Sequence, residues 1–283
     1  MSYENPQVPH DVNVARGSHL LEFLRLGAGV ALVFGMAAAV LYFAGGQLAR
    51  FMPFSWERSW VGERVIGIEA VEPADAKADA DAAQISEYLQ RLTTQLAASM
   101  DLPNDMVVQT HYSSMAVPNA FATLGGHIVI TRKLYELMPS ENALAMVLAH
   151  EIAHVKHRDP IGALGGAASL TLLLALVSGD ASSLGPELAM LVQRGYSRDA
   201  ERRADSAAIA ALRAYYGHAG GAAAVFEQLS ATRASGRFDA PTLLATHPTD
   251  TERIAHLESA AQGWDAASEP LRPLAVPILN QGR

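Results

Sequence analysis

Cysteine is absent from the 283 residues of this chain, and basic residues are outnumbered by acidic ones. Without cysteine the protein can form no disulfide bonds and can support no thiol chemistry, and its redox compartment is left open. Lysine and arginine together number 21 against 29 aspartates and glutamates, and they form no run along the chain. This acidic balance gives no support for a nucleic-acid partner.

One uncharged stretch near the N-terminus is long enough to cross a membrane. It covers 24 residues from Leu26 to Ala49, between Arg25 and Arg50. As a helix it would be about 36 Å long, whereas the apolar core of a cleaved signal peptide has about 7 to 15 residues. We therefore predict an uncleaved transmembrane helix over residues 26–49, preceded by a polar, loosely ordered tail over residues 1–25.

The residues that follow this helix resemble a membrane-interface segment. Four aromatic side chains are typical of such a belt, although they could instead pack on the rest of the protein: Phe51, Phe54, Trp56 and Trp60. Arginines on both sides of the helix do not decide its orientation. Because the N-terminal tail is short, we predict that it lies in the cytoplasm and that the rest of the chain lies outside. In a bacterium that is the periplasmic face of the inner membrane.

The stretch from Ser140 to Asp159 predicts a helix that carries a metal site. Ser140 is a good N-cap, and apolar residues recur at helical spacing after it: Ala143, Leu144, Val147, Leu148 and Ile152. His150 and His154 are four residues apart, so both imidazoles can reach one zinc ion at about 2.0 to 2.1 Å. Glu151 is turned by roughly 100° from His150. It would stand beside the metal, where a general base can take a proton from water.

A His-Glu-x-x-His pattern can also be the polar face of an ordinary helix, so the third ligand is decisive. A histidine at position 160 would indicate a metzincin, but the chain has Pro160 there. The segment from Tyr196 to Leu212 supplies Glu201 instead, with Asp205 one turn later. Glu201 would complete a His, His, Glu site, and Asp205 could accept the second N–H of a ligating imidazole. Acidic residues beside arginines can also be a solvated helix face.

The sequence HEIAH followed by SRDAERRAD resembles the membrane-associated gluzincin metallopeptidases, the family of the HtpX protease and the type I CAAX prenyl protease. The segments PNAFATLGGHIVIT and THPTDTERI fit the same family. The resemblance implies one zinc ion per chain bound by His150, His154 and Glu201, with Glu151 as catalytic acid/base and Asp205 supporting a ligand. Leu124 departs from the family, whose members often have proline at that position.

A short strand before the histidine helix is predicted to border the substrate cleft. Residues 117–122 and 127–131 can form two strands joined by Gly125 and Gly126. In the family such a strand borders the cleft, and its free edge could pair with an extended peptide through backbone groups around Asn119 and Ala120. Alternatively, Asn119 merely begins a strand.

His247 is expected at the mouth of the zinc site, although it lies far from the other ligands in sequence. Thr249 and Glu252 have the spacing of a capping box, so a helix is predicted to begin near Thr249 and to leave His247 in the loop before it. The residue could stabilise the transition state or occupy the fourth position of the zinc until substrate arrives. It could also be a loop histidine that binds a nearby carbonyl group.

A second uncharged stretch, Ile161 to Gly179, has 19 residues and would qualify as a membrane span by length alone. A single crossing there would carry Glu201 to the opposite side of the membrane from His150 and His154. We therefore predict a helix that is buried in the domain or rests on the bilayer surface, with small residues that allow close packing.

The predicted fold class is α+β and mostly helical, a gluzincin-type zinc metalloprotease domain with a small β-sheet behind one transmembrane helix. The expected parts are a tail (1–25), the membrane helix (26–49), a juxtamembrane segment (50–65), the peptidase domain (66–262) and a C-terminal tail (263–283). The expected partners are polypeptides and the lipid bilayer. The resemblance implies that unfolded or misassembled envelope proteins are hydrolysed.

Two other functions stay open. The chain could be a chaperone or scaffold that keeps zinc only for folding. The second is prenyl-peptide processing. That activity would need an intramembrane chamber built from several membrane spans, whereas the sequence predicts a single span.

Overall fold

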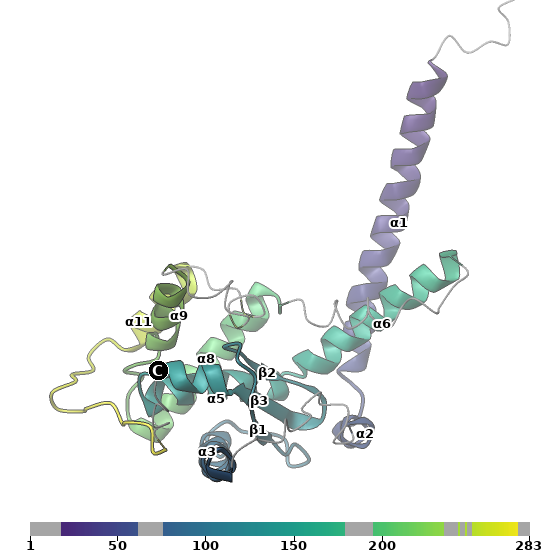
Figure 1. The fold of residues 1–283 in the computed structure, drawn as a ribbon. Helices are drawn as coiled ribbons and strands as arrows, with labels where there is room; N and C mark the ends of the chain where they lie inside the picture. The colour runs from purple at the N-terminus through teal and green to yellow at the C-terminus, as the bar shows by residue number, and fades with distance from the viewer. Residues whose placement is uncertain are drawn as a thin grey trace, which may run out of the picture. The chain divides into compact units, whose positions relative to one another are not determined.

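The computed structural model describes residues 18–61, 76–178, 195–234, 243, 247 and 251–276, and the chain divides into two units, residues 1–41 and 42–283. Figure 1 shows mostly helices with one small sheet, and the fold class is as the sequence predicts. The elements in chain order are α1 (His19–Ala49), α2 (Phe54–Trp60), α3 (Ala76–Ala97), β1 (Gln109–Ser113), β2 (Ala120–Ala122), η1 (Leu124–Gly126), β3 (His127–Thr131), α4 (Arg132–Leu137), α5 (Glu141–Lys156), α6 (Asp159–Ser178), α8 (Arg198–Tyr216), α9 (Ala224–Ala234) and α11 (Thr251–Ala260).

The first unit contains most of α1, whose side chains are exposed along its length, as with Phe23 at 73% and Val30 at 70%. The helix is long and apolar enough to cross a membrane. It begins at His19 rather than at Leu26, so the prediction of a loosely ordered tail is wrong for residues 19–25. Leucines in this segment favour helix, and Glu22 lies in the first turn, where a negative charge is stabilising.

The second unit is organised around α5. All residues of this helix from Glu141 to Val155 are buried, and it contacts α3, α8 and the sheet. Ser140 begins it as predicted, because its hydroxyl oxygen accepts the N–H of Ala143 at 3.2 Å. A helix buried on every side is held in a fixed place, which suits it to carry a site.

The sheet has the strand order β1-β3-β2, with β1 parallel and β2 antiparallel to the central strand β3. The predicted turn between the last two strands is present at Gly125 and Gly126, whose φ angles are 71° and 84°. A side chain at Gly126 would lie 2.2 Å from the carbonyl oxygen of Val107, so the turn requires glycine there. Leu124 begins the short helix η1 at this turn. Strand β2 is shorter than the predicted 117–122.

Helix α6 packs closely on the last turns of α1 within the second unit. A Cβ atom added to Gly45 would lie 1.9 Å from Ser169 Oγ, and one on Gly165 would lie 2.4 Å from Ala49 Cβ. The far end of α6 exposes apolar side chains, including Leu176 at 75%. Its length and composition also fit a membrane span. The prediction that it does not cross the bilayer stays a prediction.

The juxtamembrane aromatic residues divide between the two expected roles. Phe54 on α2 is buried, whereas Phe51, Trp56 and Trp60 are exposed at 85%, 55% and 51%. Glu57 on the same helix accepts the N–H of Gly125 at 3.1 Å and pairs with Arg158. Helix α2 is therefore attached to the domain through Phe54 and Glu57 and leaves the other aromatic residues exposed.

The C-terminal segment lies against the start of α5. Glu141 N–H donates to the carbonyl of Arg272 at 2.8 Å, and Tyr135 donates to the carbonyl of Val276 at 2.7 Å. Contacts with the domain therefore extend beyond the boundary predicted at residue 262. The β-like run expected at residues 66–71 lies outside the described residues.

Candidate metal centre

Two helices bring the predicted ligands together. His150 and His154 lie one turn apart on α5, and Glu201 lies in the first turn of α8. Helix α8 is capped by Ser197, whose side chain accepts the N–H of Ala200. Small buried residues allow the two helices to approach closely: Ala149 and Ala153 on α5 and Ala204 and Ala208 on α8. The site is therefore built on two packed helices rather than on mobile loops.

Four buried side chains converge on one point, with donor atoms all within 4.8 Å of one another: His150, His154, Glu201 and His247. Nε2 of His150 lies 3.0 Å from Nε2 of His154 and 3.3 Å from Glu201 Oε2. Nε2 of His154 lies 3.5 Å from Glu201 Oε1. Donors at about 2.0 to 2.1 Å from a tetrahedral zinc ion are about 3.3 Å apart. The observed separations fit such an ion.

Carboxylates orient both imidazoles from behind. Asp205 Oδ1 lies 2.9 Å from His150 Nδ1, and Asp159 Oδ2 lies 2.9 Å from His154 Nδ1. A proton on each Nδ1 leaves the Nε2 lone pair directed at the centre, the arrangement usual for metal-binding histidines. Asp205 was expected in this position. Asp159 was not, because the sequence shows it only as the end of the histidine helix.

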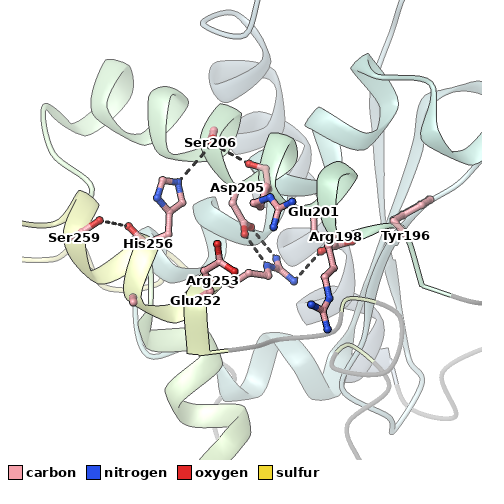
Figure 2. A pocket seen from close by; sticks show the side chains of 11 residues that line it. Tyr196, Arg198, Glu201, Asp205, Ser206, Glu252, Arg253, His256 and Ser259 are labelled. Carbon is pink, nitrogen blue, oxygen red and sulfur yellow. Dashed lines mark hydrogen bonds and ion pairs between the residues drawn. The ribbon is translucent and has the colours of Figure 1, made fainter.

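Arg253 is a second residue that the sequence analysis missed. It reaches from α11 to Asp205 with two hydrogen bonds, Nε–Oδ2 at 2.7 Å and Nη2–Oδ1 at 2.8 Å (Figure 2). Its Nη1 lies 2.8 Å from Glu201 Oε2, and its guanidinium lies over the ring of Phe226. Only its place in the THPTDTERI segment could have indicated it. Arg253 holds both carboxylates that α8 brings to the site.

A pocket of about 400 Å³ opens beside these residues between α8 and α11 (Figure 2). Glu201, Asp205 and Arg253 line it together with Arg198 and His256. The ring of Tyr196 also lines the pocket and stacks on His154 with centroids 4.1 Å apart.

The charges of the site favour a bound cation. Burial raises the pKa of the Glu201 carboxyl, but hydrogen bonds from three histidines outweigh it and hold that pKa well below its usual range. Burial likewise opposes ionisation of Asp205, yet Arg253 and His150 lower its pKa to about 2. Burial lowers the pKa of His150, and its bonds to Asp205 and Glu201 raise it overall to about 10. A divalent ion would take the place of protons on the Nε2 atoms that face Glu201, while the Nδ1 protons stay bound to Asp205 and Asp159.

Glu151 lies next to the four donors without being one of them. It is fully buried, and its Oε2 accepts the N–H of Ala122 on β2 at 2.8 Å. Among the described residues its Oε1 accepts no hydrogen bond and lies 3.4 Å from His247 Nε2. One oxygen is therefore fixed by the strand, while the other is available to accept a proton.

Strand β2 forms one edge of the sheet, and its register separates Asn119 from Ala120. Asn119 turns its backbone toward β3, where its carbonyl accepts the N–H of Thr131 at 3.0 Å and its N–H donates to Thr131 Oγ1 at 2.9 Å. Antiparallel pairing alternates, so the backbone groups of Ala120 point to the outer edge. The register contradicts the expectation for Asn119 and suits Ala120.

His247 is buried inside the site rather than at its mouth, with 2% of its surface exposed. Its Nδ1 lies 3.2 Å from both His150 Nε2 and Glu201 Oε1. Its backbone N–H donates to the carbonyl of Leu243, whose own N–H donates to the carbonyl of Pro118. Leu243 thus attaches His247 beside β2. Helix α11 is described over Thr251–Ala260, and Thr249, where the helix was predicted to begin, lies outside the described residues.

Known proteins similar to this chain include proteases. The chain is 30% identical over 200 residues to the putative beta-barrel assembly-enhancing protease of Vibrio cholerae, covering 64% of this chain and 40% of that protein. It is 26% identical over 278 residues to the HtpX protease homologue of Salinibacter ruber, covering 83% and 96%. It is 27% identical over 230 residues to the beta-barrel assembly-enhancing protease of Escherichia coli, covering 68% and 45%.

The chain therefore spans less than half of each beta-barrel assembly-enhancing protease and nearly all of the HtpX homologue. Residues 83–261 match peptidase family M48. This segment is well over half of the chain, and it contains the four converging side chains together with Glu151. The chain belongs to peptidase family M48, in agreement with the gluzincin resemblance of its sequence.

Proposed function

We propose that the protein is a membrane-anchored zinc metalloendopeptidase. The observation that carries the proposal is the set of four buried donors within 4.8 Å of one another, with Glu151 beside them. His150, His154 and Glu201 would hold one zinc ion. Two histidines and a glutamate at these spacings, with both Nδ1 atoms bound by carboxylates, fit this metal better than calcium or magnesium, which prefer oxygen ligands.

A zinc ion at this site supplies Lewis-acid polarisation of a carbonyl group and makes water more acidic. Glu151 accepts the proton of the attacking water at Oε1 and returns it to the leaving amine, so the residue ends the cycle unchanged. Its Oε2 stays bound to the N–H of Ala122, which keeps the carboxylate in place through both transfers. Tyr196 and the surrounding apolar residues exclude other water from His154.

The outer edge of β2 orients the substrate. The N–H and carbonyl groups of Ala120 can pair with an extended peptide, which gives affinity without requiring one side-chain sequence. Ala122 connects this strand to Glu151, so a peptide on the edge would lie next to the proton acceptor. An unfolded segment can adopt this extended form, whereas a folded domain cannot.

We further propose that the His247 side chain occupies the centre until substrate arrives. Nδ1 of His247 completes the four-donor set, and the bond of Leu243 to Pro118 lies next to the edge where a peptide would bind. Substrate would displace the His247 imidazole from the other three donors. The alternative, a hydrogen bond to the oxyanion, requires the same ring to stay near the centre with Nε2 protonated.

The expected substrates are unfolded or misassembled envelope proteins. The names of two relatives, beta-barrel assembly-enhancing proteases, support a task in the bacterial envelope. Helix α1 is compatible with a transmembrane anchor. We propose a single crossing at α1, with the peptidase domain on the periplasmic side of the inner membrane.

The test combines metal analysis with casein cleavage for the wild type and for Glu151→Gln. We expect zinc in both proteins and cleavage only by the wild type, because glutamine cannot accept the proton. An absence of zinc from the wild type would refute the site. Zinc without cleavage that depends on Glu151 would favour a chaperone or scaffold that uses the metal for folding alone.

A further inference from the structure

The predicted membrane helix is connected to a metal ligand through one carboxylate. Arg50 directly follows α1, and its Nη2 donates to Asp159 Oδ1 at 3.0 Å. The other oxygen of Asp159 accepts the Nδ1–H of His154 at 2.9 Å. Two hydrogen bonds therefore lead from the end of α1 to a ligating imidazole, and all three residues lie in the same unit of the chain.

Asp159 depends on these partners because its side chain is only 1% exposed. A buried carboxylate needs hydrogen bonds to both oxygens, since losing one leaves a desolvated charge without compensation. Arg203 lies 3.7 Å from the oxygen that Arg50 contacts, beyond hydrogen-bonding distance. Arg50 is the closer cation, and its side chain is only 34% exposed.

The position of Arg50 depends in turn on the packing of α1 against α6. A Cβ atom on Gly162 would lie 2.7 Å from Arg50 Nε, and one on Gly46 would lie 2.9 Å from the carbonyl oxygen of Gly162. The two helices approach closely enough to fix the guanidinium beside Asp159. A pocket of about 150 Å³ at this junction is lined by Arg50, Asp159 and Tyr196, among others.

We propose that Arg50 is a positioning residue of the metal centre, which couples the packing of the membrane helix to the orientation of His154. The inference rests on the proposed zinc site. Arg50 fixes the Asp159 carboxylate, and Asp159 fixes the tautomer and the ring of His154. Partners of this kind typically change metal affinity by about 10- to 100-fold when they are lost. Displacing the end of α1 would then weaken zinc binding without touching a ligand.

Arg158 provides a matched control. It also attaches the juxtamembrane segment to the domain, through Glu57 and the carbonyl of Met52. It bonds neither Asp159 nor His154 among the described residues. If Arg50 merely fastened the anchor to the domain, Arg158→Gln would have the same effect on zinc as Arg50→Gln.

The test measures zinc affinity of the full-length protein in detergent by competition with a chelator, together with the melting temperature of the metal-free form. We expect Asp159→Asn to weaken zinc binding by about 10- to 100-fold and Arg50→Gln by a smaller factor of at least about 3. Arg50→Lys should recover much of the loss, and Arg158→Gln should bind zinc as the wild type does, even where it lowers the melting temperature.

Equal zinc affinity of Arg50→Gln and the wild type would overturn the inference and leave the proposed function standing. Equal losses of zinc affinity in Arg50→Gln and Arg158→Gln would also overturn the inference, because both variants would then act only through attachment of the anchor. A wild type that binds no zinc would instead overturn the proposed function, and with it the inference.

Discussion

The guanidinium of Arg253 binds both Asp205 and Glu201, and no sequence pattern predicted either contact. The proposed ligands on α5 and α8 follow from spacing within a helix, which the sequence displays directly. Arg253 and Asp159 act across contacts that are distant in sequence or lie at a helix junction, and no local pattern encodes such contacts. His247 was identified only because its motif resembles a family.

Replacing Arg253 by methionine removes a buried cation from between two carboxylates. Methionine is shorter and uncharged, so the variant loses the hydrogen bonds and charge that bind both carboxylates, together with the cation–π contact with Phe226. Breaking a buried ion pair on one side typically costs about 3 to 5 kcal/mol of stability. We expect a loss of this size in urea unfolding of the metal-free protein, together with weaker zinc binding. The control is Arg213→Met, which replaces an exposed arginine of α8 that binds only the carbonyl of Ala260 among the described residues. Equal unfolding midpoints for the two variants would contradict this role.

His247→Ala separates the roles of that residue. If Nδ1 holds the fourth position until substrate arrives, the variant should have a higher kcat/KM on unfolded casein and a lower zinc affinity. If the ring stabilises the transition state, kcat should fall, because loss of a strong oxyanion donor raises the activation free energy by about 2.7 to 4 kcal/mol. The geometry around Nδ1 favours the first result. A variant equal to the wild type in both catalysis and zinc affinity would exclude both roles, and His247 would then be only a structural histidine of its loop.

At the scale of elements, capping and periodicity predicted α5 well because this helix contains its own signals. Ser140 caps α5 as expected. The start of α1 was missed because the charges at Glu22 and Arg25 end the uncharged stretch but do not end a helix. Asn119 was misassigned because the phase of an edge strand depends on its register with a partner strand, here Thr131 opposite Asn119. Register is a property of two segments and is not visible in one.

Two neighbouring histidines on strands β1 and β3 lead us to expect that the protein loses stability in acid. His111 Nε2 and His127 Nδ1 are 2.8 Å apart, a distance that permits one shared proton. Burial lowers the pKa of both histidines, and in His127 the neighbouring His111 and Arg58 lower it further. Below the ordinary histidine pKa, the unfolded chain therefore binds more protons than the folded chain. The free energy of unfolding falls as pH drops through about 6.5, and this loss levels off below the pKa values of the folded state.

The measurement compares urea unfolding of the metal-free wild type and His111→Gln at pH 7.5 and pH 5.5. Glutamine can still hydrogen-bond His127 but does not titrate. We expect a smaller loss of stability on acidification in the variant, since all other groups titrate in both proteins. A loss as large as that of the wild type would show that the pair does not respond to acid.

At the scale of the whole molecule, the position of the ligands constrains membrane topology. Donor atoms on α5 and α8 lie within 4.8 Å of one another, so we expect these two helices to lie on the same side of the membrane. A single crossing by α6, which connects the two regions, is incompatible with that. Topology reporters fused after Asp159 and after Asp180 should therefore report the same compartment. Opposite compartments would refute our prediction that α6 does not cross the bilayer.

The most direct test of the zinc site is the metal content and melting temperature of the purified protein, before and after EDTA, for the wild type and Glu201→Gln. A zinc ion shared by α5 and α8 binds only the folded state, which stabilises that state by about 4 kcal/mol at a thousandfold excess over Kd. We predict one zinc per wild-type chain and a melting temperature that EDTA lowers, with less zinc and little effect of EDTA in the variant. A wild type without zinc, or one whose melting temperature EDTA leaves unchanged, would contradict the account.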